Sequence, residues 1–157
     1  MKRFLIIIFI GLLISCSKIA FPPQNAEETL ESMMQAWASL DEDGLLSVLM
    51  DSEEDYFLGT DSNEIWIGNS AFMRAVVEQF GSFDSIDIRN IDRKLQYSPS
   101  GDAAWFTDIA DWTISIGQEN IALSGVRMTG VFTYENDSWK LRNMHTSLGV
   151  NGQAAAY

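Results

Sequence analysis

Cysteine, histidine and proline are scarce in this chain, and acidic residues outnumber basic ones. Its 157 residues include one cysteine, one histidine, three prolines, 10 Lys+Arg and 22 Asp+Glu, for a net charge of −12. A single cysteine excludes an internal disulfide, and with a single histidine it excludes a zinc finger or any metal site built mainly from Cys and His. A strongly negative surface repels a phosphate backbone, so nucleic acid is not expected as a partner.

Apolar residues are abundant enough for a packed core. They make up 46% of the chain, against 20% charged residues, which excludes wholesale disorder. The length suits one domain of ordinary size, and the sequence contains no internal repeat.

The N-terminus has the form of a secretory signal. A basic start at residues 1–3 precedes an apolar run at 4–14, which is shorter than the roughly 20 residues that cross a bilayer. Residues 13–16, Leu-Ile-Ser-Cys, resemble the bacterial lipobox. The resemblance implies cleavage before Cys16, lipidation of its thiol, and attachment to the membrane of a bacterial cell envelope, with the outer membrane and its periplasmic side expected. The alternative is an ordinary signal peptide with a chance cysteine.

The chain therefore divides into four expected parts. Residues 1–15 are a lipoprotein signal peptide, and residues 16–24 are a lipidated tether whose Pro22-Pro23 pair favours extended backbone. Residues 25–148 form the folded domain, and residues 149–157 form a flexible tail without a periodic pattern.

Helical spacing of apolar residues predicts three helices in the first half of the domain. The first covers about 26–40, with Asn25 three residues before Glu28 in a capping arrangement. After the interruption Asp-Glu-Asp-Gly at 41–44, a short second helix is expected at 45–50. Asn69 or Ser70 is expected to cap a third helix that ends at Gly81.

The remaining segments have the period of two that is typical of strands. Two brief strands at 56–58 and 65–67 flank a polar loop, and four long strands follow near 86–97, 103–116, 121–134 and 139–148. The apolar alternation slips in the first long strand, which predicts a β-bulge near Asn90 that curls the sheet. The expected fold class is α+β: a curved antiparallel sheet, made of a four-stranded meander plus a short hairpin, packed against three N-terminal helices.

This order of elements resembles the cone-shaped fold of the nuclear transport factor 2-like superfamily, and three motifs resemble its SnoaL-like branch. The motifs are Phe57-Leu58-Gly59-Thr60-Asp61 with Glu64, Trp66 and Gly68; Arg127-Met128-Thr129-Gly130-Val131; and Trp139-Lys140-Leu141 with His145 and Ser147. The last also resembles the association domain of calcium/calmodulin-dependent kinases. The resemblance implies a conical pocket between sheet and helices and often a homodimer. It implies no single activity, because this fold carries cyclases, isomerases, dehydratases and non-catalytic modules.

His145 is the first candidate for chemistry. Unbroken alternation on the last strand places Trp139, Leu141, Asn143 and His145 on the face toward the cone. A histidine there could act as a general base or orient a ligand. The alternative is a core histidine held by one hydrogen bond.

Arg127 and Glu64 are the next candidates. By the resemblance, Arg127 points into the cone and offers a planar fork to a carboxylate-bearing ligand, although it could instead pair structurally with Glu64 or face outward. Glu64 could be an acid or base at the mouth of the cone. Thr60 and Asp61, in the same loop, more simply stabilise the turn.

Aromatic side chains and one aspartate complete the candidate site. Tyr56, Trp66 and Trp105 are expected ligand-contacting residues, although aromatic residues in a domain of this size also simply form the core. Asp108 could be a base if it is desolvated in the cone; its face, like that of Asp111, depends on an unbroken strand.

Three functions follow from these residues. The first is a membrane-anchored domain that binds a small hydrophobic or amphipathic molecule. The second is a cyclase, isomerase or dehydratase with His145, Glu64 or Asp108 as catalytic group, which requires no metal or other cofactor. The third is a dimeric scaffold whose pocket is filled by its own side chains.

Overall fold

A computed structural model describes residues 25–150 and residue 152 of the chain. The expected signal peptide, its Cys16 and the tether lie outside these residues, as does most of the expected tail. The described elements, in chain order, are α1 (Ala26–Ser39), α2 (Glu42–Val48), β1 (Tyr56–Leu58), β2 (Ile65–Ile67), α3 (Asn69–Phe80), β3 (Ser85–Tyr97), β4 (Ala103–Ile116), β5 (Glu119–Glu135) and β6 (Ser138–Ser147).

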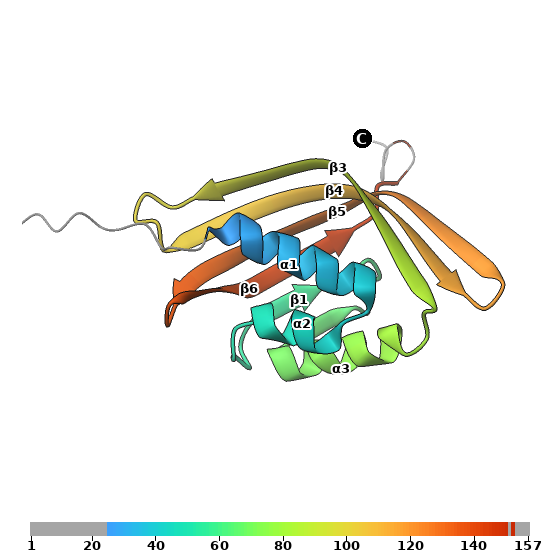
Figure 1. Cartoon of the computed structure of the whole chain (residues 1–157), viewed down its shortest axis with the longest axis horizontal. Coiled ribbons are helices and arrows are strands. Elements are labelled where there is room, and N and C mark those ends of the chain that lie inside the picture. The colour runs from blue at the N-terminus through green and yellow to red at the C-terminus, as the bar shows by residue number, and fades with distance from the viewer. Residues whose placement is uncertain (1–24, 151, 153–157) are drawn as a thin grey trace, which may run out of the picture.

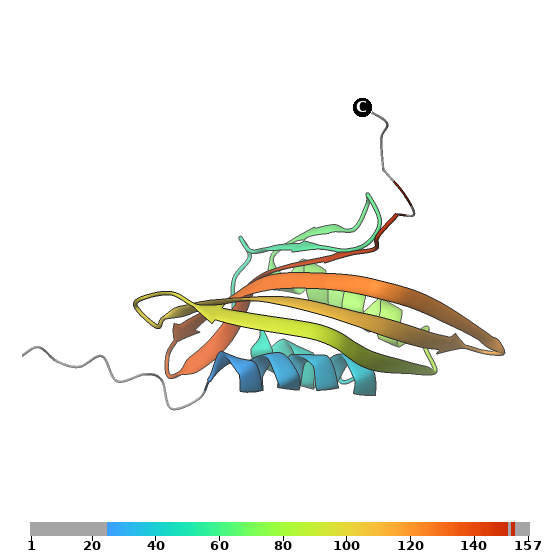
Figure 2. The same cartoon turned by 90° about the horizontal axis from the view of Figure 1, so that it is seen from above.

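The strands form one curved sheet in the order β2-β1-β6-β5-β4-β3 (Figure 1). The meander β3–β6 and the hairpin β1–β2 are antiparallel, which confirms the predicted α+β fold. The hairpin joins the meander through a parallel pairing, in which Phe57 lies opposite Met144, so the sheet as a whole is mixed. The long strands bow along their length when viewed from above, and α1 runs along one face of them (Figure 2).

The helices bury one face each, and two of them begin differently from the prediction. Asn25 caps α1 as expected, its side-chain oxygen accepting from the N–H of Glu27. The helix α2 begins at Glu42, because the Asp41 side chain accepts a hydrogen bond from the N–H of Gly44. The acidic residues 42 and 43, predicted to interrupt the helices, therefore form the first turn of α2. Gly68, with φ +84°, precedes α3, and neither predicted side chain caps it.

Three strand bulges set which side chains face the helices. Ile91 has no partner on β4, which confirms the predicted bulge near Asn90. On β5, Gly125 (φ +65°) is the extra residue and donates its N–H to Asp111. On β6 the extra residue is Arg142, since Val131 lies opposite Asn143 and Phe132 lies opposite Leu141. Each bulge reverses the inward and outward alternation beyond it.

The core fills the space between the helices and the concave face of the sheet. It is made of buried side chains from all three helices and the four long strands, with Phe57 of β1 stacked on Phe72 of α3 at 4.3 Å between ring centroids. Gly130 gives the Phe106 ring room to pack, because a Cβ there would lie 2.6 Å from that ring. Among the described helices, none combines the length and apolarity needed to cross a membrane.

Candidate functional site

A cavity of about 210 Å³ lies between α3, the end of α1 and the concave face of the sheet. Its floor consists of buried side chains from the helices and from β4, β5 and β6, listed here: Trp37, Phe72, Val76, Trp112, Ile114, Val126 and Met144. Aromatic rings dominate this floor, and Trp37 and Trp112 lie 5.8 Å apart between centroids. The cavity therefore offers an apolar, largely aromatic interior, as small-ligand sites do.

The polar side chains of the cavity lie where its wall is partly exposed to solvent. Thr60 and Glu64 come from the β1–β2 loop, Gln79 from α3 and Thr146 from β6, and none of the four is buried. Trp66 stands beside them, half-buried, with its ring 5.8 Å from that of Phe72. The mouth of the cavity thus carries polar side chains beside partly exposed apolar ones such as Leu58 and Phe83, and the interior is apolar, an arrangement suited to an amphipathic occupant.

Glu64 is positioned by its own loop. Its Oε2 accepts from the backbone N–H of Asp61 at 3.0 Å and from the Thr60 hydroxyl at 3.3 Å. A Cβ at position 59 would collide with this carboxylate, so Gly59 leaves the space in which Glu64 lies. No hydrogen bond within the described chain involves Oε1, which leaves one carboxylate oxygen for an occupant. Of the described residues that line the cavity, Glu64 alone is charged.

Trp37 contributes an unsatisfied donor. Its indole ring lines the cavity, yet its buried Nε1 has no acceptor among the described residues. Buried N–H groups are nearly always paired, so an orphan of this kind needs an explanation. Because Nε1 itself has essentially no accessible surface, it is not exposed in the cavity wall, and only other parts of the indole ring are available to an occupant.

The prediction that His145 faces the cone is wrong. The bulge at Arg142 reverses the alternation of β6, so Met144 and Thr146 line the cavity and His145 is exposed, opposite Thr129 on the outer face. The inward position of Trp139 and Leu141, before the bulge, is confirmed. A general base or ligand donor at His145 would therefore lie on the wrong side of the sheet.

Three further candidates also lie outside the cavity. Arg127 is exposed and its guanidinium lies next to Gly149, so it is neither the anchor in the cone nor a partner of Glu64. Trp105 is 43% exposed and donates its Nε1 hydrogen to Gln96 at 3.0 Å, and Tyr56 is 50% exposed. The strand register puts Trp105, like Tyr56, on the outer face, opposite the face that the helices cover. Of the predicted aromatic contacts, Trp66 alone lies in the cavity wall.

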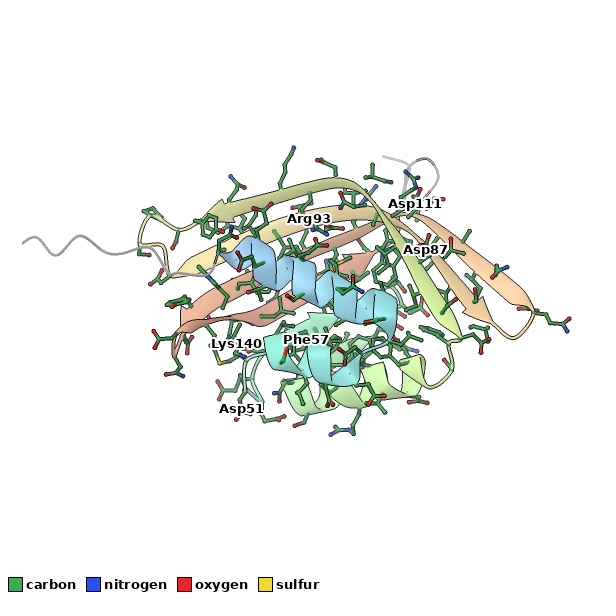
Figure 3. The ribbon with its side chains drawn as sticks, in the orientation of Figure 1. Asp51, Phe57, Asp87, Arg93, Asp111 and Lys140 are labelled. Carbon is green, nitrogen blue, oxygen red and sulfur yellow. The ribbon has the colours of Figure 1, made fainter. Side chains whose placement is uncertain are left out.

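Asp108 is buried on the helix side of the sheet but belongs to an ion pair. It is 1% exposed and accepts from Arg93 Nε at 2.5 Å and from Asn90 at 2.9 Å. Arg93 extends from β3 toward α1, where its second nitrogen meets Glu31 at 2.6 Å (Figure 3). Burial lowers the pKa of Arg93, but the hydrogen bonds and charges of both carboxylates outweigh it and hold this pKa above the ordinary value. Asp108 is not part of the cavity wall and cannot touch an occupant there.

Most of the cavity wall was not identified as a site from the sequence. The apolar spacing of α1 and α3 marked Trp37, Phe72 and Val76 as core, and they are core residues that also border a space. Gln79 carried a usable signal, because it is a polar residue on the face of α3 that includes Val76. Thr146 could have been found through Met144, an apolar residue two positions earlier whose parity differs from that of Trp139 and Leu141.

Metal chemistry has no support in the described side chains. No group of three or more His, Cys, Asp or Glu side chains converges within residues 25–150. The carboxylates instead pair with cations or cap turns. Asp55, for example, accepts hydrogen bonds from Nε and Nη2 of Arg142, with nitrogen–oxygen distances of 2.9–3.2 Å. These hydrogen bonds are the main reason that the pKa of Arg142 lies above its ordinary value, and burial opposes them with a smaller effect.

Comparison with known proteins places the domain in a family. The model of the SnoaL-like domain matches residues 26–151. No curated protein matches the chain at a significant level.

Solved structures share the fold at low sequence identity. A nuclear transport factor 2-like superfamily protein from Salmonella enterica serovar Typhimurium has a TM-score of 0.72 at 15% identity, over 83% of this chain and 93% of that one. A protein from Streptomyces avermitilis, named as a candidate dehydratase of this family, has a TM-score of 0.72 at 16% identity, over 80% and 95%. A candidate ketosteroid isomerase from Shewanella frigidimarina has a TM-score of 0.63 at 13% identity, over 80% and 96%.

Proposed function

Because this chain belongs to the family of SnoaL-like domains and has an open cavity, we propose that it binds a small, largely apolar ring compound. The observation that supports this proposal most directly is the cavity itself, which has a volume of about 210 Å³, a largely aromatic interior and polar side chains at its mouth. A dry apolar cavity of about 150 Å³ is enough to take up benzene. A cavity of this size therefore suits one ring or two fused rings with a short polar substituent.

An open cavity argues against a scaffold whose interior is plugged. The side chains that surround the space leave it unfilled. A purely structural domain would gain stability by closing the space, since unfilled volume forfeits packing contacts. We take the retained cavity as support for binding.

Binding is tested directly with indole, a two-ring probe. Isothermal titration is carried out on residues 17–157, which retain every described element and the whole described core. Indole binds the unchanged protein, and Ala75→Leu, which places a larger side chain in the cavity wall, weakens binding at least ~tenfold.

The matched control is Val77→Leu, on the exposed side of the same helix and outside this cavity. This variant keeps the affinity of the unchanged protein. Absence of indole binding, or equal loss in both variants, contradicts the proposal.

A proton-transfer enzyme is the second candidate. It is favoured by one observation, the Glu64 carboxylate at the cavity mouth, and by the fold shared with a candidate dehydratase and a candidate isomerase. Glu64 would be the base or acid, in place of His145 and Asp108. Binding ranks first because Glu64 is the one titratable group in the wall, and lyase or isomerase chemistry commonly uses an acid and a base together.

We propose further that the domain is anchored to a bacterial membrane by lipid on Cys16. The support is the lipobox-like Leu-Ile-Ser-Cys at 13–16 after a short apolar run. Multiple acyl chains on one terminus make such anchoring durable, while the folded domain stays in water.

A further inference from the structure

The charge at the cavity mouth defines the ligand more narrowly. Among the described residues, Glu64 is the one charged side chain in the wall, and the predicted site residues Arg127 and His145 lie on the outer face of the sheet. An anionic ligand would therefore bring its charge next to a carboxylate with no cation to offset it.

The carboxylate is also prepared to accept a hydrogen bond from outside the protein. Thr60 and Asp61 hold Oε2, which fixes the group against Gly59, while Oε1 accepts no hydrogen bond from a described residue. A ligand ammonium could donate to Oε1 with no rearrangement of the loop. Charge-assisted bonds of this type are stronger than those between neutral groups.

Aromatic rings next to the carboxylate favour the same sign of charge. Trp66 lines the mouth beside Glu64, and the faces of indole rings attract cations. The chain as a whole carries a net charge of −12, which raises the local concentration of cations over anions. The Glu64 carboxylate, the Trp66 ring and the net negative charge of the chain therefore all favour a positively charged ligand.

We propose that the ligand is an aromatic amine, with its ring in the apolar interior and its protonated nitrogen at the mouth against Glu64. This rests on the proposed binding function and adds the sign and position of the ligand charge. Gln79 and Thr146, which also line the cavity, offer neutral polar contacts.

Three probes with one ring system and different charge test the inference. Tryptamine is a cation, tryptophol is neutral and indole-3-acetate is an anion at neutral pH. Titration calorimetry on residues 17–157 gives their affinities at low and at high salt. Tryptamine binds ~tenfold or more tightly than indole-3-acetate, with tryptophol between them.

Two variants separate the direct contact of the ligand with Glu64 from the effect of the protein's overall negative charge. Glu64→Gln keeps the shape and an oxygen for Thr60 and Asp61 but removes the charge, and it reduces the preference for the cation to ~twofold or less. Glu78→Gln makes the same change at an exposed residue of α3 outside the cavity wall, and it leaves the preference unchanged.

The outcomes distinguish the two proposals. If none of the probes binds, the proposed function fails and this inference fails with it. If they bind with equal affinity, or the anion binds best, ligand binding stands and the aromatic amine is wrong. A preference that survives in Glu64→Gln, or that falls equally in Glu78→Gln, overturns the assignment to Glu64.

Discussion

Two carboxylates on the helix side of the sheet have different surroundings and therefore different roles. Asp108 is enclosed and neutralised by Arg93, and Glu64 stands at the solvent-facing mouth of the cavity without a cation. Desolvation of an ion is costly, so a fully buried carboxylate is retained only with partners. The pairing that stabilises Asp108 also removes it from chemistry.

Neutralising Asp108 tests this division. Asp108→Asn leaves Arg93 partly buried with Glu31 as its remaining carboxylate, and we expect the free energy of unfolding in urea to fall by about 2 kcal/mol. Affinity for indole stays unchanged, because the residue does not border the cavity.

The matched control is Asp92→Asn, whose carboxylate is exposed and lies 3.9 Å from the Lys94 nitrogen. Its effect stays within about 0.5 kcal/mol, as for surface ion pairs. A loss of indole binding in Asp108→Asn without a loss of stability would contradict this account and restore a role at the site.

At the scale of the element, the helices and strands were predicted well from the sequence, but the residues of β6 that face the helices were predicted wrongly beyond Leu141. The bulge in β3 was predictable, because apolar residues sit on both sides of it and their parity visibly slips. The bulge in β6 was missed although it carries a signal of the same kind: polar Asn143 and His145 follow Leu141 at the same parity, and apolar Met144 lies at the other. One extra residue thereby reversed the assignment of His145, as a register slip does for every residue beyond it.

Arg142 is the extra residue, and it fastens β6 to the segment before β1. Both forks of its guanidinium bind Asp55, whose side chain is 10% exposed, and a second carboxylate, Glu135, lies 3.2 Å away. Removing it by Arg142→Ala leaves Asp55 without its cation, and we expect a loss of about 1–3 kcal/mol in unfolding free energy. Hydrogen exchange at β1 is expected to accelerate more than at β4.

Lysine at position 142 separates the effect of the positive charge from that of the paired hydrogen bonds that the guanidinium makes with Asp55. Arg142→Lys recovers less than half of the lost stability, because an ammonium cannot make the paired bonds of a guanidinium. The control Arg74→Ala removes an exposed cation from α3. Full recovery by lysine, or an equal effect of Arg74→Ala, would contradict a role for the bulge in holding β1.

At the scale of the whole molecule, anchoring is the first property to test. We expect the full-length protein expressed in a bacterium to sediment with membranes and to be released by detergent. Cys16→Ser blocks lipidation and shifts the protein to the soluble fraction, whereas Ser17→Ala leaves it on the membrane. A chain that stays soluble with Cys16 intact would contradict the lipoprotein proposal.

The uncovered face of the sheet is the place where we propose that two copies pair. A row of neighbouring residues crosses it, with Trp105, Val131, Asn143, Tyr56 and Ile67 in register across five strands. Four of them are exposed hydrophobic side chains. Light scattering on residues 17–157 is expected to give the mass of a dimer, and Val131→Arg the mass of a monomer with an unchanged circular dichroism spectrum. A monomeric parent protein would contradict the proposal.

The central claim is that the cavity, and no other surface, takes up a small ring compound. Methyl-labelled methionine reports on it in NMR spectra, because Met144 lines the cavity and Met73 lines the groove between α2 and α3. Titration with indole is predicted to shift the Met144 methyl resonance in a saturable manner and to leave that of Met73 in place. Saturable shifts confined to Met73, or none at Met144, would contradict the account.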